Sequence, residues 1–167
     1  MGNTLKEIIQ DKKETLNLIK KNNSLDSLEK KIKDLNFFYD FKKKIQSNKG
    51  ISLISEIKKA SPSGGTIVKN FNHLDIAKMY IDNGSTCLSV LTEEKHFLGK
   101  LNYISDIKKK FRTPILAKDF FIDPYQIALS KSYGCDCILL ILAALDGSQA
   151  DEIYDEAKKK NLSIIVE

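Results

Sequence analysis

The sequence predicts an α/β protein in which strands and helices alternate along the chain. Five short apolar runs, each of a length suited to a buried strand, occupy residues 51–57, 87–91, 114–117, 137–141 and 162–166. Segments with apolar residues at helical spacing separate them, at residues 74–83, 101–111, 124–133 and 149–160. The strands begin about every 30 residues, as successive βα units do. Near-continuous apolar strands of this kind indicate a parallel sheet with helices outside it.

Turn-forming residues mark the ends of three of these helices. Leu74, Ala77 and Ile81 recur close to the helical period in the first of them. Asn or Gly follows the helices where a left-handed residue would stop them, in the pairs Asn83-Gly84, Tyr133-Gly134 and Lys160-Asn161.

Residues 1–48 precede the first strand and have the pattern of two helices. Ser24, followed by Asp26, has the chemistry of an N-cap between them. We expect this segment to be an N-terminal helical extension that packs on a main domain formed by residues 49–167. Two apolar stripes would make the contact, the first with Leu5, Ile8, Ile9, Leu16 and Ile19, the second beginning with Ile32, Leu35 and Phe38.

Two architectures fit the alternation, a doubly wound open sheet and a (β/α)8 barrel. The first strand is not followed by the Gly-rich G-x-G-x-x-G turn of dinucleotide-binding sheets, which disfavours that function. Five βα units are too few to close an eight-stranded barrel. If the fold is a barrel, we therefore expect it to be incomplete.

Composition and local charge disfavour several classes of protein. The 167 residues are 42% hydrophobic and 29% charged, which is ordinary for a globular protein and unlike a disordered or fibrous one. No apolar run is long enough for a transmembrane helix. The charged residues at 11–14 stand where a signal peptide would need an apolar core. We expect a cytoplasmic protein with no membrane partner.

The net charge of +5 (27 basic minus 22 acidic residues) comes partly from lysine runs at 42–44, 108–110 and 158–160. Solvated helix faces explain these runs better than a nucleic-acid groove, because no aromatic residues interleave with them. A small anionic substrate is compatible with the same charge. Cys87, Cys135 and Cys137 lie in strand-like segments, where we expect small buried hydrophobic residues and no metal site.

Charged residues stand at the ends of several apolar runs, where a core strand does not need them. Glu56 and Lys58 are two residues apart and would share one face of the first strand. Lys118 closes the third run and Glu167 the fifth. In an α/β barrel the catalytic groups project from these carboxyl ends, so the four side chains would converge on one rim. The loop after the first strand, Ser61-Pro62-Ser63-Gly64-Gly65, has hydroxyl and amide groups suited to an anion.

Each of these signals also has a simpler structural explanation. Glu56 and Lys58 could form an exposed ion pair beside a polar turn. Asp119 or Asp123 could cap the following helix, and Asp123 fits better because Pro124 then takes the first helical position. His73 and His96 do not lie at strand ends, so we expect them to be loop or surface residues and not general bases.

Four segments together resemble the indole-3-glycerol phosphate synthase family. The segment from Glu56 to Ser63, reading EIKKASPS, is similar to the first-strand signature of that family. The segment SVLTE, followed by Phe97 and Gly99, resembles its second strand and loop. Lys118-Asp119-Phe120 resembles the third strand, and Gly134-Cys135-Asp136 with the apolar run after it resembles the fourth. The resemblance covers essentially the whole chain, in order and at the right spacing.

The resemblance implies a (β/α)8 TIM barrel and a reaction that needs no metal or organic cofactor. The substrate would be 1-(2-carboxyphenylamino)-1-deoxyribulose 5-phosphate, which closes to indole-3-glycerol phosphate with loss of CO₂ and water. Lys118 would be the general acid, and Lys58 would pair with the substrate carboxylate. Glu167 would stabilise charge on the anilino nitrogen and act as base, and Glu56 would hold the lysines in place. Ser61, Pro62 and Ser63 would lie near the polar end of the substrate, and the anthranilate ring would occupy a slot formed by Phe97, Phe120 and Leu139.

The chain departs from the family pattern in its length. It ends at the fifth strand, so the strands and phosphate-binding loops that follow in the family are not in the sequence. We expect the isolated 167-residue polypeptide to be inactive and poorly folded, because an open barrel exposes two apolar edges. Three alternatives stay open: a truncated, inactive remnant, another phosphate-handling TIM barrel such as phosphoribosylanthranilate isomerase, and a synthase fused to an isomerase domain in a longer protein.

Overall fold

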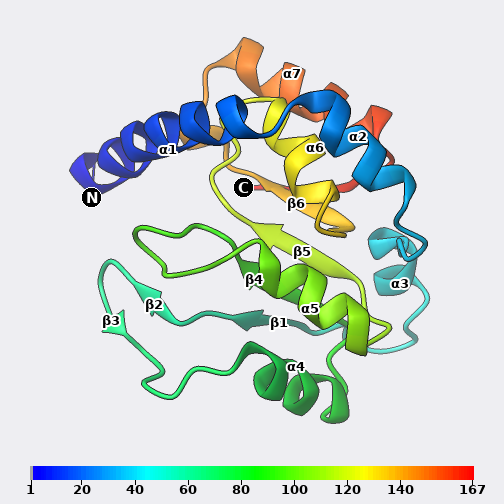
Figure 1. Ribbon diagram of the computed structural model, residues 1–167. Helices are drawn as coiled ribbons and strands as arrows, with labels where there is room; N and C mark the ends of the chain where they lie inside the picture. The colour runs from blue at the N-terminus through cyan, green and yellow to red at the C-terminus, as the bar shows by residue number, and fades with distance from the viewer. Residues whose placement is uncertain (1) are drawn as a thin grey trace.

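A five-stranded parallel sheet forms the centre of the protein. The computed structural model describes residues 2–167. The strands run in the order β1, β4, β5, β6, β7, each beside its predecessor in the sheet (Figure 1). This arrangement confirms the α/β prediction, and the order contains no reversal of the kind that defines a doubly wound sheet. The strands are β1 (Ile54–Ile57), β4 (Cys87–Leu91), β5 (Ile115–Lys118), β6 (Cys137–Leu140) and β7 (Ser163–Val166).

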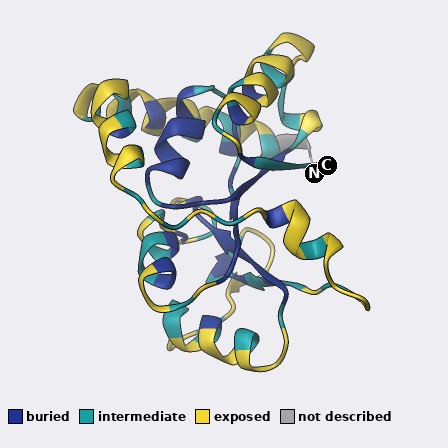
Figure 2. Cartoon of the chain, turned by 90° about the vertical axis from the view of Figure 1, so that its right-hand side faces the viewer, coloured by how far each residue is buried: buried dark blue, intermediate teal, exposed yellow. Residues whose placement is uncertain are grey.

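Four helices cover the outer face of the sheet, close to the predicted positions. They are α4 (His73–Asp82), α5 (Asn102–Lys110), α6 (Tyr125–Lys131) and α7 (Gly147–Lys159). Leu88 and Val90 of β4 and Ile138 of β6 face these helices and are fully buried among them. Figure 2 shows the buried strands enclosed by helices whose outer sides are exposed.

The predicted helix stops are confirmed by their backbone conformation. Gly84 and Gly134 follow α4 and α6 with φ of 87° and 96°, and Asn161 follows α7 with φ of 55°. Glycine and asparagine adopt this left-handed conformation most readily, so these residues end the helices at low cost.

The inner face of the sheet carries the alternate residues of each strand. Cys87, Leu116, Cys137 and Leu139 form a second buried cluster, and Phe41 of α3 (Phe41–Gln46) packs against them. In Figure 1 α3 lies at the end of the sheet where the strands begin, away from the hairpin that follows β1. Because side chains alternate along a strand, Glu56 and Lys118 belong to this inner face.

The N-terminal helices pack on the outside of α6. Leu16 of α1 (Gly2–Asn22) and Leu28 of α2 (Leu25–Lys33) are buried against Tyr125 and Leu129 of α6. The first apolar stripe is confirmed, and Ser24 caps α2 by accepting a hydrogen bond from the Ser27 amide (3.2 Å).

The second apolar stripe was predicted too long. Helix α2 ends at Lys33, so Leu35 and Phe38 lie in a non-helical connection instead. Aromatic side chains hold this connection in place: Phe38 and Tyr39 lie under the ammonium groups of Lys131 and Lys108, 4.4 and 4.2 Å from the ring centroids.

The structure differs from the prediction at the start of the first strand and in two connections between elements. Residues 51–53 are not part of the first strand, because pairing with β4 begins only at Ile54, and Ile51 is exposed. The predicted loop after β1 contains a short antiparallel hairpin, β2 (Ala60–Ser61) and β3 (Gly65–Thr66), and a 3-10 turn, η1 (Leu142–Ala144), follows β6.

Lys108 is buried, although the lysine run at 108–110 predicted a solvated face. Its ammonium pairs with the Asp136 carboxylate, and both side chains are fully inaccessible. Asp136 also accepts hydrogen bonds from the amides of Tyr39 (2.6 Å) and Ile115 (2.8 Å). The pair therefore joins α5, the start of β5, the start of β6 and the N-terminal connection. Burial opposes both charges, since it raises the pKa of Asp136 and lowers that of Lys108.

The three cysteines are free and buried, as predicted. Burial raises the pKa of the Cys87 thiol to about 11 and that of Cys137 to about 12, and it raises the pKa of Cys135 as well. Within residues 2–167, no helix combines the length and the apolar character needed to cross a membrane.

Candidate active site

Glu56, Lys58 and Lys118 come together at the carboxyl ends of β1 and β5. The Lys118 ammonium lies 2.9 Å from Glu56 Oε2, and the Lys58 ammonium contacts Glu56 Oε1. Thus one carboxylate bridges two lysines from separate strands. All three side chains are roughly one-third exposed, so they are open to a ligand and not sealed in the core.

The charges of this triad reinforce one another. Burial alone would raise the pKa of Glu56, but hydrogen bonds from Lys58 and Lys118 and their positive charges outweigh it and hold the pKa below its ordinary value. Glu56 is therefore ionised at neutral pH. Two ammonium groups fixed around one carboxylate can bind an anionic substrate group and can donate a proton to a carbonyl or hydroxyl oxygen.

The register of the sheet adds one residue that the sequence analysis did not assign. Ser89 of β4 lies directly opposite Glu56 of β1 and Leu116 of β5, so it belongs to the inner face. It is 4% exposed, and within the described part of the chain its hydroxyl has no hydrogen-bond partner. A buried hydroxyl without a partner is uncommon in proteins. The signal in the sequence was a polar residue inside an otherwise apolar strand.

Two residues of the predicted aromatic slot, Phe97 and Phe120, lie in the loops that follow β4 and β5. The rings of Phe97 and Phe120 are 6.3 Å apart between centroids and inclined by 42°. Phe120 follows Lys118 by two residues, and both rings are half-buried. Leu139 is buried on the inner face of β6, in the cluster that contains Leu116.

A buried carboxylate fixes the loop that carries Phe97. Glu93, 3% exposed, accepts hydrogen bonds from three successive amides, those of Lys95 (3.2 Å), His96 (2.7 Å) and Phe97 (3.0 Å). At the far end of the loop the Gly99 amide donates to the Glu93 carbonyl oxygen (2.7 Å). The loop from 93 to 99 is therefore closed by its own hydrogen bonds, which help to fix the position of Phe97.

The loop after β1 forms the turn of the β2–β3 hairpin. Ser61 Oγ accepts a hydrogen bond from the Gly64 amide (3.0 Å), which shapes the turn. Pro62 and Ser63 are exposed at its tip, and Gly65 has φ of 59°. The hydroxyl of Ser61 thus serves the turn, and the structure shows no convergence of Ser61, Pro62 and Ser63 on the lysines.

The described contacts of Glu167 are made by its backbone. Its backbone is bonded to the end of β6, since its amide donates to the Leu140 carbonyl (2.9 Å) and its carbonyl accepts from the Leu142 amide (2.9 Å). Continuing the strand pattern from Ile165 places it on the inner face. Among the described residues its carboxylate makes no ion pair with Lys58 or Lys118, and its side chain is exposed.

Asp119 and the two histidines serve contacts between elements. Asp119 pairs with Lys12 of α1 (2.6 Å). Asp123 accepts a hydrogen bond from the Tyr125 amide (2.9 Å), but the capping prediction is wrong in its register, because Pro124 is the N-cap and α6 begins at Tyr125. His73 contacts Asp106 (3.2 Å) and His96 contacts Asp11 (2.7 Å). Neither histidine reaches the triad.

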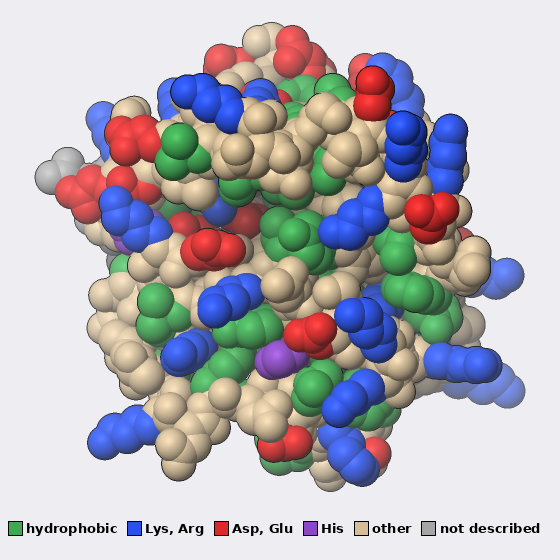
Figure 3. Space-filling model, in the orientation of Figure 1, with side chains coloured by type: hydrophobic (Ala, Val, Ile, Leu, Met, Phe, Trp, Pro, Cys, Tyr) green, Lys and Arg blue, Asp and Glu red, His purple; other side chains and the backbone are tan. Residues whose placement is uncertain are grey.

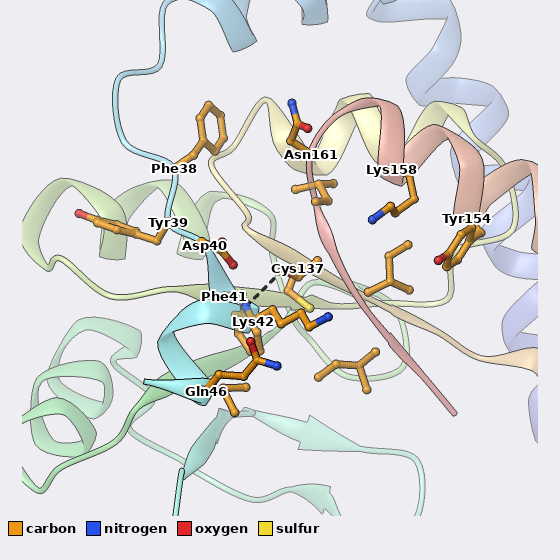
Figure 4. A pocket seen from close by; sticks show the side chains of 15 residues that line it. Phe38, Tyr39, Asp40, Phe41, Lys42, Gln46, Cys137, Tyr154, Lys158 and Asn161 are labelled. Carbon is orange, nitrogen blue, oxygen red and sulfur yellow. Dashed lines mark hydrogen bonds between the residues drawn. The ribbon is translucent and has the colours of Figure 1, made fainter. Parts of the chain in front are cut away.

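One cavity lies away from these residues. It has a volume of about 810 Å³ and opens between α3, α7 and the edge strand β7 (Figure 4). Phe38, Tyr154 and Ile165 line it, and the Lys42 amide donates to Ser163 Oγ across it (3.3 Å). None of the predicted site residues lines it, so we assign the site from the converging charges and not from cavity size.

Over residues 2–167, no group of three or more His, Cys, Asp or Glu side chains is placed to hold a metal ion. Figure 3 shows basic side chains scattered between acidic and apolar ones on the face in view.

Comparison with known proteins places the chain in a family. The sequence model for indole-3-glycerol phosphate synthase matches residues 5–167. The indole-3-glycerol phosphate synthase of Aliarcobacter butzleri is 46% identical over 98% of this chain and 63% of its own length. That of Legionella pneumophila (strain Lens) is 43% identical over the whole chain and 64% of its own length. The tryptophan biosynthesis protein TrpCF of Buchnera aphidicola from Acyrthosiphon pisum is 44% identical over 98% of this chain, which is 35% of that protein.

The chain therefore spans just under two thirds of the synthases that it matches. The match includes the strand ends that carry Glu56, Lys58 and Lys118. Sequence model, relatives and strand-end chemistry agree: this chain belongs to the indole-3-glycerol phosphate synthase family.

Proposed function

We propose that the protein containing this chain closes the indole ring of indole-3-glycerol phosphate. Its substrate would be 1-(2-carboxyphenylamino)-1-deoxyribulose 5-phosphate, and CO₂ and water would leave. The observation that carries the proposal is the Glu56 carboxylate held between Lys58 and Lys118 at the open end of two parallel strands. Membership of the family supports the same reaction.

The roles of the lysines follow from the charge changes in the reaction. As the aromatic ring attacks the ribulose carbonyl carbon, negative charge develops on the carbonyl oxygen, and the Lys118 ammonium would protonate it. The Lys58 ammonium would pair with the substrate carboxylate before CO₂ is lost. Glu56 would keep both ammonium groups in place. Its negative charge would balance part of their positive charge once the substrate carboxylate has left as CO₂.

The remaining predicted residues would hold the substrate. Phe97, Phe120 and Leu139 would form the slot that contacts the anthranilate ring, and the neighbouring phenyl rings of Phe97 and Phe120, 6.3 Å apart between centroids, support a shared aromatic surface there. Ser61, Pro62 and Ser63 would lie near the polar end of the substrate. Glu167 would face the anilino nitrogen and act as base when the ring regains aromaticity.

We further propose that the fold is an incomplete (β/α)8 barrel with a helical extension at residues 1–48 and a barrel domain at 49–167. The sequential strand order and the apolar inner face closed by Phe41 support this. Activity would then need further strands beside β7, and the 167 residues alone would be inactive. Turnover by the 167-residue polypeptide would overturn this part of the proposal.

The proposal also covers the cellular location of the protein and the longer polypeptide to which it belongs. A location in the cytoplasm and a small phosphorylated substrate fit the family. We also propose a longer polypeptide with an additional isomerase domain, because the Buchnera relative is much longer than the matched segment. No observation favours the two alternatives, an inactive remnant or a phosphoribosylanthranilate isomerase, over the synthase.

Replacement of Lys118 tests the proposal. In the full-length protein, Lys118→Ala should lower turnover of the carboxyphenylamino-deoxyribulose phosphate by about a hundredfold or more, because the general acid is lost. Lys109→Ala, which removes an exposed lysine far from the triad, should leave turnover unchanged. Activity toward phosphoribosylanthranilate in place of this substrate, or near-normal turnover by Lys118→Ala, would contradict the assignment.

A further inference from the structure

We infer that helix α1 positions both aromatic walls of the ring slot, through the adjacent residues Asp11 and Lys12. This inference rests on the proposed function for its consequence, but its geometry is independent of the reaction. The two side chains have opposite charges and reach two different loops. One loop follows β4 and carries Phe97, and the other follows β5 and carries Phe120.

Asp11 holds the outer side of the loop after β4. Its two carboxylate oxygens contact Lys95 Nζ (2.6 Å) and His96 Nε2 (2.7 Å), the two residues immediately before Phe97. These hydrogen bonds lower the pKa of Asp11. The Glu93 carboxylate binds the same stretch through its backbone amides, so the loop is fastened from inside and from outside.

Lys12 holds the loop after β5. Its ammonium lies 2.6 Å from Asp119 Oδ1, and both side chains are only about one-tenth exposed. The same Asp119 oxygen accepts the Phe120 amide (2.8 Å), and the other oxygen accepts the Thr92 hydroxyl (2.8 Å). Lys12 therefore balances the charge of the buried Asp119 carboxylate. This carboxylate in turn orients Phe120 and joins the two loops.

Helix α1 is also held by contacts that do not involve these two charges. Leu16 is buried against α6, and Lys20 forms a separate ion pair with Asp123 one turn further along. A helix that needed only to be anchored would be held by these contacts. Asp11 and Lys12 instead reach the residues next to the two phenyl rings, which makes them positioning residues and not catalytic ones.

The two contacts differ in burial, and this predicts a rank order. Loss of Lys12 leaves the Asp119 carboxylate almost buried and without its cation, so the loop after β5 must rearrange. Loss of Asp11 frees Lys95, which is already 63% exposed, and His96. The effect of Lys12→Met should therefore exceed that of Asp11→Ala, and both should exceed that of Lys13→Met, which changes the exposed neighbour of Lys12.

The test combines kinetics with hydrogen exchange on the full-length protein. For Lys12→Met we expect kcat/KM for the carboxyphenylamino-deoxyribulose phosphate to fall by about ten- to a hundredfold. Most of the loss should be in KM, because a displaced wall weakens ring binding before and during the reaction. Amides of residues 93–99 and 119–122 should exchange faster than in Lys13→Met, and Lys12→Arg should restore most of both properties.

The outcomes separate this inference from the proposed function. If Lys12→Met and Asp11→Ala match Lys13→Met in both kinetics and exchange, or lower only the melting temperature, α1 merely stabilises the fold and the inference is wrong. If the wild-type protein does not turn the substrate over, the proposed function fails. The exchange comparison then still decides whether α1 positions the two loops.

Discussion

Gly99 offers the sharpest test of how the ring slot is built. It ends the loop that carries Phe97, where its amide donates to the Glu93 carbonyl oxygen. A Cβ at this position would lie 2.6 Å from the Leu91 carbonyl carbon, closer still to its oxygen, and 2.9 Å from the Glu93 oxygen. All three atoms belong to the backbone, so no side chain can swing away to make room.

The required movement can be worked out from these distances. Ordinary contact begins at 3.4 Å, so the loop must retreat from Leu91 by at least 3.4 − 2.6 = 0.8 Å. Leu91 belongs to β4 and is paired with β5, so the flexible partner is the loop. A shift close to 1 Å of a substrate-positioning group can cost about a hundredfold in rate. We expect Gly99→Ala to lower kcat/KM by about this factor.

Gly147→Ala is the matched control. Gly147 is the first residue of α7, and a Cβ there would meet nothing within 4 Å. Alanine in a helix should be neutral or stabilising by about 0.4–1 kcal/mol. Steady-state kinetics and thermal unfolding of both variants decide the matter. Equal kcat/KM for Gly99→Ala and Gly147→Ala would show that the loop does not position Phe97.

Three more predictions concern the charges and the core. Glu56→Gln should reduce kcat by about a hundredfold or more. Because the folded pKa of Glu56 lies below 4.5, its stabilising effect should be complete above about pH 4.5 and fade as the pH falls further, so the Tm difference from wild type should shrink in acid. Lys108→Met should destabilise the protein by about 3–5 kcal/mol in urea unfolding, since it strands Asp136, whereas Lys109→Met, at an exposed site, should cost almost nothing. The raised thiol pKa values and burial predict no reaction of Cys87, Cys135 or Cys137 with a thiol reagent at pH 8 until urea unfolds the chain, and fast labelling of the native protein would contradict this.

The alternation of strands and helices could be predicted because each element has its own local signal. The strand from 87 to 91 matches its prediction at both ends, because its mostly apolar run is bounded by the polar residues Thr86 and Thr92. The first strand was predicted three residues too long, because apolar composition does not reveal where a partner strand begins. The β2–β3 hairpin was missed because its two-residue strands are set by turn geometry and not by a hydrophobic pattern.

Residues of the candidate site could be predicted where a charged side chain stands at the end of an apolar strand, because burying a charge is costly. Glu56, Lys58 and Lys118 drew attention as charges at the ends of apolar strands, and they meet in the fold. Ser89 was not predicted, because burying a serine in a strand costs too little free energy to make the residue unusual there. Lys108 was misjudged for the opposite reason: its neighbours in the run are solvated, and only the distant Asp136 makes its burial tolerable. The network of α1 joins residues more than 80 positions apart, which no local pattern reveals.

The central claim is that the two lysines around Glu56 carry out a decarboxylating ring closure. The most direct measurement is release of labelled CO₂ from carboxyl-labelled 1-(2-carboxyphenylamino)-1-deoxyribulose 5-phosphate by the full-length protein, followed together with the appearance of indole-3-glycerol phosphate. The account predicts equal amounts of both products from the wild type and almost none from Lys118→Ala. No release by the wild type, or equal release by the variant, would contradict it.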